Sequence, residues 1–172
     1  MHNKKSVLRI TYTAIFTTII LLATAFVKFS TGLGEGYIHF GDSIIYLTAC
    51  VLPFPYCIAA CAFGGALADI ISGFAIWSIP TAVIKSLNAL PFVFFCKKSK
   101  ILCKQTISMT IVSGIITILG YFVTECILYS VASATLSILG NTIQAVASGI
   151  IFIIMAHALD KINFKSKITK GV

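Results

Sequence analysis

The chain is built from long apolar runs that contain almost no charged side chains. The first, from Ile10 to Val27, is 18 residues long, close to the roughly 20 residues that a helix needs to cross a bilayer core. Of all 172 residues, 58% are hydrophobic and 10% are charged, whereas a soluble domain carries about 25% charged residues. So few charges cannot keep a folded surface in water. The sequence therefore predicts an integral membrane protein.

The positions of these runs predict an all-α fold, a compact bundle of six transmembrane helices that forms one membrane domain over residues 1–172. The predicted helices lie at about 7–29, 42–52, 56–71, 79–96, 106–129 and 139–159. The second and third, about 11 and 16 residues long, are short for full spans. We expect such helices to be buried against their neighbours rather than to face lipid alone.

The basic residues predict the orientation of this bundle. Eleven of the thirteen lie in three clusters: Lys4, Lys5 and Arg9; Lys97, Lys98, Lys100 and Lys104; and Lys161, Lys165, Lys167 and Lys170. With six helices, all three clusters fall on one side and Glu35 and Asp42 on the other, so the positive-inside rule places both termini in the cytoplasm. The clusters form no stripe with interleaved aromatic residues, and we expect no nucleic-acid binding.

Polar side chains interrupt the apolar runs, where charge is costly and usually functional. They are Asp69, Lys85, Asn88, Glu125, Asn141 and Gln144. Lys85 and Asn88 are three residues apart and share a helix face, as do Asn141 and Gln144. In the predicted topology these groups lie near mid-membrane or in the outer half, where they would converge on a small polar ligand. Structural pairing, such as Asp69 with Lys85, is the alternative interpretation.

The first predicted outer loop, in the stretch GEGYIHFGD, adds polar groups on the same side. Glu35, Tyr37, His39 and Asp42 are candidate residues of a lid over the site, and the three glycines of this stretch supply the backbone freedom that closure requires. Trp77 lies in the second outer connection. A flat heteroaromatic ligand would stack on such aromatic residues, although Trp and Tyr also form interfacial belts without a ligand.

Small residues spaced four apart mark faces on which membrane helices approach closely. In the third predicted helix, Ala60, Gly64 and Ala68 favour packing inside the bundle. In the first, Ala14 and Thr18 are compatible with internal packing or with docking to another membrane subunit.

The sequence contains no P-loop, H-E-x-x-H, G-x-S-x-G or Rossmann fingerprint. We therefore expect no enzyme activity, no ATP binding by this chain and no cofactor. The six cysteines include no C-x-x-C pair and lie mostly in apolar segments, so no metal site is expected. The chain is also short for a transporter of two inverted halves, so transport would require oligomerisation or energy from a partner.

Three motifs, GYIHFGD, ALADIISG and PTAVIK, follow one another between Gly36 and Lys85. In this order and spacing they resemble the substrate-binding S components of energy-coupling factor (ECF) vitamin transporters, in the branch around hydroxymethylpyrimidine, pyridoxine and riboflavin. The resemblance extends over nearly the whole chain. It implies a protein of the bacterial plasma membrane that captures a vitamin from outside, with the first outer loop closing over the site.

The resemblance also implies partners and a ligand region. An S component associates with an ECF transmembrane coupling protein and two cytoplasmic ATPase subunits. It docks through an Ala-xxx-Ala motif on the first helix, at the positions of Ala14 and Thr18, where threonine replaces the second alanine. The ligand is held by the first outer loop and the outer halves of the fourth, fifth and sixth helices, the regions that hold the polar residues described above.

Both charge signs and amide groups in this region suit a neutral to zwitterionic heterocycle with hydroxyl groups. Pyridoxine or hydroxymethylpyrimidine fits this description, and riboflavin, which needs a longer cavity, comes next. The alternative is a stand-alone secondary transporter in which Asp69, Lys85 or Glu125 relays protons. A membrane enzyme is disfavoured because no nucleophile–base pair is visible.

Overall fold

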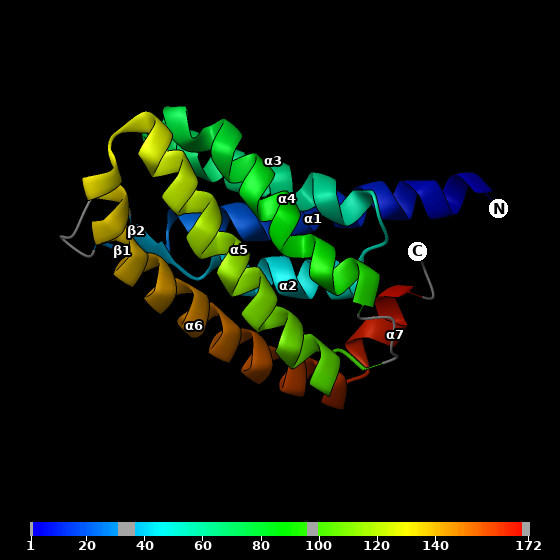
Figure 1. The fold of residues 1–172 in the computed structure, drawn as a ribbon. Helices are drawn as coiled ribbons and strands as arrows, with labels where there is room; N and C mark the ends of the chain where they lie inside the picture. The colour runs from blue at the N-terminus through cyan, green and yellow to red at the C-terminus, as the bar shows by residue number, and fades with distance from the viewer. Residues whose placement is uncertain (1, 31–36, 96–99, 170–172) are drawn as a thin grey trace.

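The computed structural model describes residues 2–30, 37–95 and 100–169 (Figure 1). In chain order the elements are α1 (His2–Ala25), β1 (Lys28–Ser30), β2 (Tyr37–His39), α2 (Gly41–Val51), α3 (Tyr56–Ile71), the 3-10 turn η1 (Ala75–Trp77), α4 (Ser78–Phe95), α5 (Lys104–Leu128), α6 (Val131–Lys161) and α7 (Phe164–Thr169). The two strands lie at one end of the bundle, called here the hairpin end. The N-terminus and α7 lie at the other, the terminal end (Figure 1).

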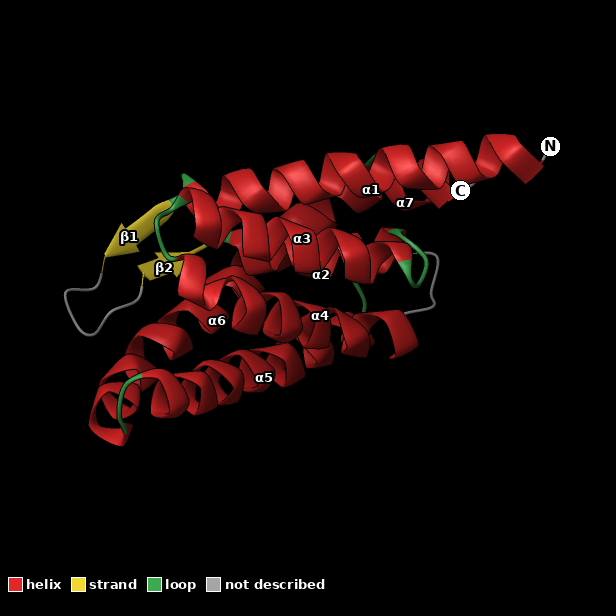
Figure 2. Ribbon diagram, turned by 90° about the horizontal axis from the view of Figure 1, so that it is seen from above, coloured by secondary structure: helices red, strands yellow, loops and turns green. Residues whose placement is uncertain are grey.

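The helices surround α2. Along the outside, α1 contacts α3, α3 contacts α4, α4 contacts α5 and α5 contacts α6, while α2 contacts α1, α3, α4 and α6. Figure 2 shows α1 and α5 on opposite sides of this arrangement. An 11-residue helix is about 16 Å long, too short to cross a bilayer core of about 30 Å. Ten of the eleven residues of α2 are buried, as expected for so short a helix.

Four helical segments are long and apolar enough to cross a membrane by length and composition, namely Lys5–Ala25, Ala75–Phe95, Lys104–Leu128 and Val131–Lys161. Large apolar side chains are exposed along all four, which suits contact with lipid chains. The chain is thus a helical membrane protein. The shorter α2 and α3 are also apolar, and a count of six spans stays a prediction.

Close packing on both sides of α3 depends on two adjacent glycines. A Cβ atom added at Gly64 would lie 2.7 Å from Ile20 of α1, and one at Gly65 would lie 3.0 Å from both Thr81 and Lys85 of α4. Both distances are shorter than ordinary van der Waals contact. The small residues of α3 therefore pack inside the bundle, as the sequence predicts.

The fold is all-α as predicted, apart from a short hairpin in the first connection that the sequence analysis does not predict. β1 and β2 pair antiparallel, with Lys28 opposite His39 and Ser30 opposite Tyr37. The first helix accordingly ends at Ala25, before the predicted boundary at 29. Aromatic and β-branched residues on both sides of a glycine-rich sequence favour strands joined as a hairpin over a longer helix.

The sixth helix begins earlier than the predicted boundary near 139. It starts after Ser130, whose side chain accepts a hydrogen bond from the backbone N–H of Ser133, a helix N-cap. The hydroxyls of Thr135 and Thr142 each bond to a carbonyl one turn earlier. A sequence rich in Ser and Thr is typical of a loop, but here the hydroxyls form their hydrogen bonds with carbonyl groups of the same helix.

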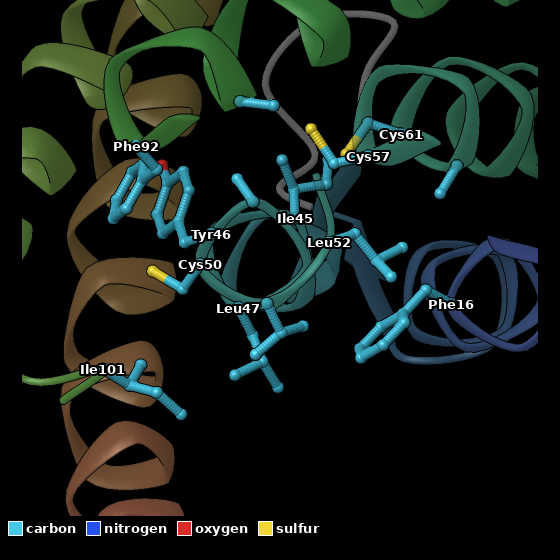
Figure 3. Close-up of a cluster of buried hydrophobic side chains, with 14 of the residues drawn as sticks. Phe16, Ile45, Tyr46, Leu47, Cys50, Leu52, Cys57, Cys61, Phe92 and Ile101 are labelled. Carbon is cyan, nitrogen blue, oxygen red and sulfur yellow. The ribbon is translucent and has the colours of Figure 1, made fainter. Parts of the chain in front are cut away.

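The apolar core lies toward the terminal end. Tyr46 of α2 stacks on Phe92 of α4 with ring centroids 4.8 Å apart (Figure 3). Phe152 of α6 meets both rings edge-on, with centroids 5.8 Å from Tyr46 and 5.5 Å from Phe92. Cys57 and Cys61 of α3 belong to the same cluster. α7, which the sequence analysis does not predict, covers this end with its buried Ile168.

Candidate functional site

A buried ion pair lies at the first turn of α2. The Lys85 ammonium of α4 is 2.6 Å from Oδ1 of Asp42, and both side chains are fully buried. Gln144 of α6 donates a hydrogen bond from Nε2 to the second oxygen of Asp42 at 3.0 Å. The two carboxylate oxygens thus join three helices, and sequence analysis singles out all three residues without pairing Asp42 with Lys85.

The same cluster is connected to the β-hairpin. The backbone N–H of His39, in β2, donates to Oε1 of Gln144 at 3.3 Å, and the N–H of Gly41 donates to Nδ1 of His39 at 3.1 Å. Burial, and secondarily the charge of Lys85, lowers the pKa of His39 to about 3. The imidazole is therefore neutral, as acceptance at Nδ1 requires. We call Asp42, Lys85, Gln144 and His39 the polar network.

Aromatic rings lie beside this network. The Lys85 ammonium is 5.1 Å from the centroid of the Tyr121 ring of α5, within the range of a cation–π contact. The Trp77 ring lies 5.8 Å from Tyr121 and 6.0 Å from Tyr129, and its Nε1 donates to the Tyr129 hydroxyl at 3.2 Å. We call Trp77, Tyr121 and Tyr129 the aromatic row. The aromatic row therefore places one flat ring, Tyr121, in contact with the buried Lys85 ammonium and a second, Trp77, next to that ring.

A second polar layer lies one helical turn closer to the terminal end. Tyr46 follows Asp42 by four residues, Asn88 follows Lys85 by three and Ser148 follows Gln144 by four, so each shares a helix face with a residue of the network. The Asn88 amide donates to Thr117 of α5 at 2.8 Å.

Three oxygens of this layer are unsatisfied. Tyr46 Oη, Asn88 Oδ1 and Ser148 Oγ are buried and have no hydrogen-bond partner among the described residues. Buried polar atoms are nearly always hydrogen-bonded, so these three atoms on neighbouring helices leave hydrogen-bonding capacity unused in the unliganded chain. Sequence analysis misses Tyr46 and Ser148, although their spacing of four from Asp42 and Gln144 is a usable signal.

The other predicted ligand residues lie apart from the network or outside the description. Glu125 is buried on α5 against Ser137 of α6, and its Oε2 has no hydrogen-bond partner among the described residues. Asn141 is half-buried, three residues before Gln144 on α6. Glu35 lies outside the described residues, as does the side chain of Tyr37, whose backbone forms part of β2.

The predicted docking residues lie on the surface of α1. Ala14 and Thr18 are both exposed. The Thr18 hydroxyl donates to the Ala14 carbonyl at 3.0 Å, so it is satisfied within the helix. Both side chains are small.

Comparison with known proteins gives two findings. The model of a family described as ECF-type riboflavin transporter, S component, matches residues 4–161, a range that holds the polar network, the second layer and the aromatic row. The chain is also similar to an uncharacterized protein in the gap 3' region of Pyrococcus woesei, with 31% identity over 132 residues, 77% of this chain and 87% of that protein.

Proposed function

Since the chain belongs to the family of ECF-type riboflavin transporter S components, we propose that it binds a flat, hydroxylated nitrogen heterocycle at its hairpin end for ATP-driven uptake by a partner module. The family is one of transporter subunits rather than enzymes. The observation that carries the proposal is the buried Asp42–Lys85 pair, which connects to the β-hairpin through Gln144.

The energetics of this pair favour a role in binding. Burying an ion pair inside a protein or a membrane costs several kcal/mol of desolvation per ion, which the mutual attraction offsets only in part. A pair that adds little net stability is most simply explained by a ligand that exchanges hydrogen bonds with it. Lys85 offers donors, Asp42 offers acceptors, and the amide of Gln144 offers both.

The two polar layers and the aromatic row favour a particular ligand shape. A ring system stacked near Tyr121 would lie beside the charges of the network. A hydroxylated chain extending from it would reach the unsatisfied oxygens of Tyr46, Asn88 and Ser148. Riboflavin, the vitamin in the family's description, has both parts. We therefore propose riboflavin ahead of pyridoxine and hydroxymethylpyrimidine, whose single rings would use the first layer alone.

We further propose the orientation and the partners. The terminal end faces the cytoplasm, because the basic clusters lie in sequence next to the helix ends on that side. The hairpin end faces outward and receives the vitamin. The exposed small residues Ala14 and Thr18 contact the ECF transmembrane coupling protein, which two cytoplasmic ATPase subunits drive.

Mass spectrometry of small molecules released from the denatured, purified protein tests the proposal. We expect one vitamin-like heterocycle, close to one per chain, after growth in several media. A double variant, Asp42→Leu with Lys85→Met, replaces the pair by apolar side chains of similar length and should release none while remaining folded. No heterocycle from the wild type in any medium, or equal amounts from both proteins, would contradict the proposal.

Two further variants map the extent of the site. Glu125→Gln and Asn141→Ala should each lower affinity for the vitamin and leave expression intact, provided that the ligand also reaches the α5–α6 side. Unchanged affinity in both would confine the ligand to the polar network and the second layer.

A further inference from the structure

A surface groove of about 390 Å³ runs between α5 and α6, which pack side by side (Figure 1). Both helices are long and apolar enough to span the membrane, so the groove faces lipid chains. Its edges are apolar side chains that are more than half exposed, namely Ile111, Ile115, Val146 and Ile150. No residue of the polar network, the second layer or the aromatic row lines it. The groove is therefore separate from the proposed vitamin site.

The floor of the groove is made of small, buried residues, Gly114, Ala145 and Gly149. A Cβ atom added at Gly114 would lie 3.2 Å from the Cβ of Ala145, so the two helices meet along this floor. The groove also contains two hydroxyls, those of Thr110 and Thr142. They donate to carbonyls of their own helices at 2.6 and 2.7 Å and have no proton left for a ligand. The groove consequently suits an apolar occupant.

The length of the groove matches the hydrocarbon region of one bilayer leaflet. It is lined within residues 107–118 of α5 and 142–153 of α6, a rise of about 16 Å along each helix. One leaflet is half of a hydrocarbon core about 30 Å thick. A membrane-spanning helix of a second copy would need a groove across the whole core, whereas a lipid acyl chain needs one leaflet only. The length therefore favours an acyl chain.

Two lysines lie beyond the end of the groove that is nearer the terminal end of the bundle. Lys104 precedes Ile111 by seven residues and Lys161 follows Ile150 by eleven, two and three helical turns, so each shares a helix face with an edge of the groove. Both are exposed. The exposed His157, one turn before Lys161, can donate a further hydrogen bond. Cationic groups thus lie where the headgroup of a lipid in the groove would be.

The charges of these lysines are not paired within the described residues, where the ion pair is that of Asp42 with Lys85. The acidic residue at this end is Asp160. Its two oxygens accept hydrogen bonds from the backbone N–H groups of Ile101 and Leu102 at 2.8 and 2.9 Å, which holds the start of α5 against the end of α6. With the exposed Lys100, three ammonium groups and one carboxylate leave a net positive charge here.

We propose that the groove between α5 and α6 binds an acyl chain of an anionic phospholipid whose phosphate lies at Lys104 and Lys161. Basic sites between membrane helices attract such headgroups. The apolar groove and the cations are separate observations, and a phospholipid is a ligand that satisfies both. The proposal goes beyond vitamin binding and does not depend on which vitamin is bound at the hairpin end.

Native mass spectrometry of the delipidated chain in detergent, titrated with phosphatidylglycerol, tests the headgroup. The test variant is Lys104→Gln with Lys161→Gln. The matched control is Lys5→Gln with Lys167→Gln, which removes two exposed charges of α1 and α7 at the same end of the bundle. We expect one tightly retained lipid per wild-type chain. Each lost cation should weaken retention about five-fold, and the pair about 25-fold, while the control changes little.

Gly149→Leu tests the acyl chain. A Cβ atom at Gly149 would make ordinary contacts with Thr110, at 3.7 and 3.8 Å, so the added side chain fills the groove without separating the helices. Ile154→Phe adds bulk to α6 at an exposed position that does not line the groove and is the matched control. We expect Gly149→Leu to lose the retained phosphatidylglycerol and Ile154→Phe to keep it. The lysine variants alone decide the proposal should Gly149→Leu fail to fold.

Four outcomes would overturn the proposal. Equal losses in the two lysine variants would indicate diffuse attraction to this end of the bundle. Unchanged retention by folded Gly149→Leu would place the acyl chain outside the groove. Equal retention of phosphatidylcholine, or displacement by millimolar glycerol phosphate, would contradict an anionic lipid as the ligand. A dimer of the wild-type chain that Gly149→Leu abolishes would assign the groove to a second copy.

Discussion

The two ends of α2 are both buried, but they are built differently. At the hairpin end Asp42 is surrounded by Lys85, Gln144 and the backbone of β2. Toward the terminal end, Leu47 and the residues from Ala49 to Leu52 belong to the apolar core. In lipid, apolar side chains stabilise a bundle through close packing, and a buried ion pair gains little over an apolar pair of the same size. The comparison indicates that the terminal end maintains the fold and the hairpin end binds.

The largest effect is expected from Asp42→Ala. This change leaves the Lys85 ammonium buried without its carboxylate. It also removes the oxygen that accepts a hydrogen bond from Gln144, so the free energy of unfolding should fall by about 3–5 kcal/mol. Thermal unfolding in detergent micelles measures it. The Asp42→Leu, Lys85→Met double variant should regain most of this stability and still fail to bind vitamin. A single variant as stable as the wild type would contradict the account of this end.

Phe16→Ala tests the apolar core at the terminal end. Phe16 is 4% exposed in the core, and its neighbour Ile15 is 46% exposed, so Ile15→Ala is a matched control. We expect a loss of about 3 kcal/mol, at the low end for a buried Phe-to-Ala change because in lipid mainly packing is lost. Vitamin affinity should stay near the wild-type value. A large loss of affinity in a protein that remains folded would show that the two ends are not separable.

Gly41→Ala probes the junction between α1 and the hairpin end of α2. A methyl group at Gly41 would collide with Oγ1 of Thr24, and overpacking of this kind costs about 1–3 kcal/mol. Adding Thr24→Ala should recover part of the loss, which a double-mutant cycle of unfolding free energies measures. Additive effects would mean that the two residues do not meet. Gly41 is thus a close-packing residue, in contrast to the backbone freedom that sequence analysis assigns to it.

Tyr46→Phe should change the free energy of unfolding least of these variants. It is diagnostic because stability and vitamin affinity should change in opposite directions. Because Tyr46 Oη is buried without a partner among the described residues, its removal should stabilise the unliganded protein by about 1 kcal/mol. If the ligand bonds to this hydroxyl, affinity should fall five- to ten-fold, the value of about one neutral hydrogen bond. Unfolding and vitamin titration on the same preparation check both signs. Unchanged affinity would remove the second layer from the proposed site.

Helix positions could be predicted from sequence wherever charged residues or proline mark a helix end. α3 spans Tyr56–Ile71, the predicted range, because Pro53 and Pro55 precede it and Ser72-Gly73 follow. The start of α6 could not be predicted from sequence. Ser and Thr residues are typical of loops, and only the structure shows that their hydroxyls bond to carbonyl groups of the same helix. β1 follows the first apolar run with no proline or glycine between them, so sequence analysis assigns Lys28 and Phe29 to the end of the first helix.

The individual polar residues of the site could be predicted from sequence because charged residues are rare in this chain. Which of them pair with one another could not be predicted. Sequence analysis offers Asp69 as the pairing partner of Lys85 and assigns Asp42 to the lid, because the carboxylate that Lys85 meets depends on how α2 enters the bundle. The structure places Lys85 against Asp42. Tyr46 and Ser148 are common residue types in membrane helices, and only the observation that their oxygens are buried without partners marks them.

Calorimetric titration of the purified chain with riboflavin, pyridoxine and hydroxymethylpyrimidine, without ATP or any partner subunit, tests the central claim most directly. We predict that one of the three, riboflavin first, binds with a nanomolar dissociation constant and that the folded Asp42→Leu, Lys85→Met variant does not bind it. Absence of binding by any of the three to the wild type, or equal binding by the variant, would contradict the claim that the hairpin end of α2 is a vitamin site.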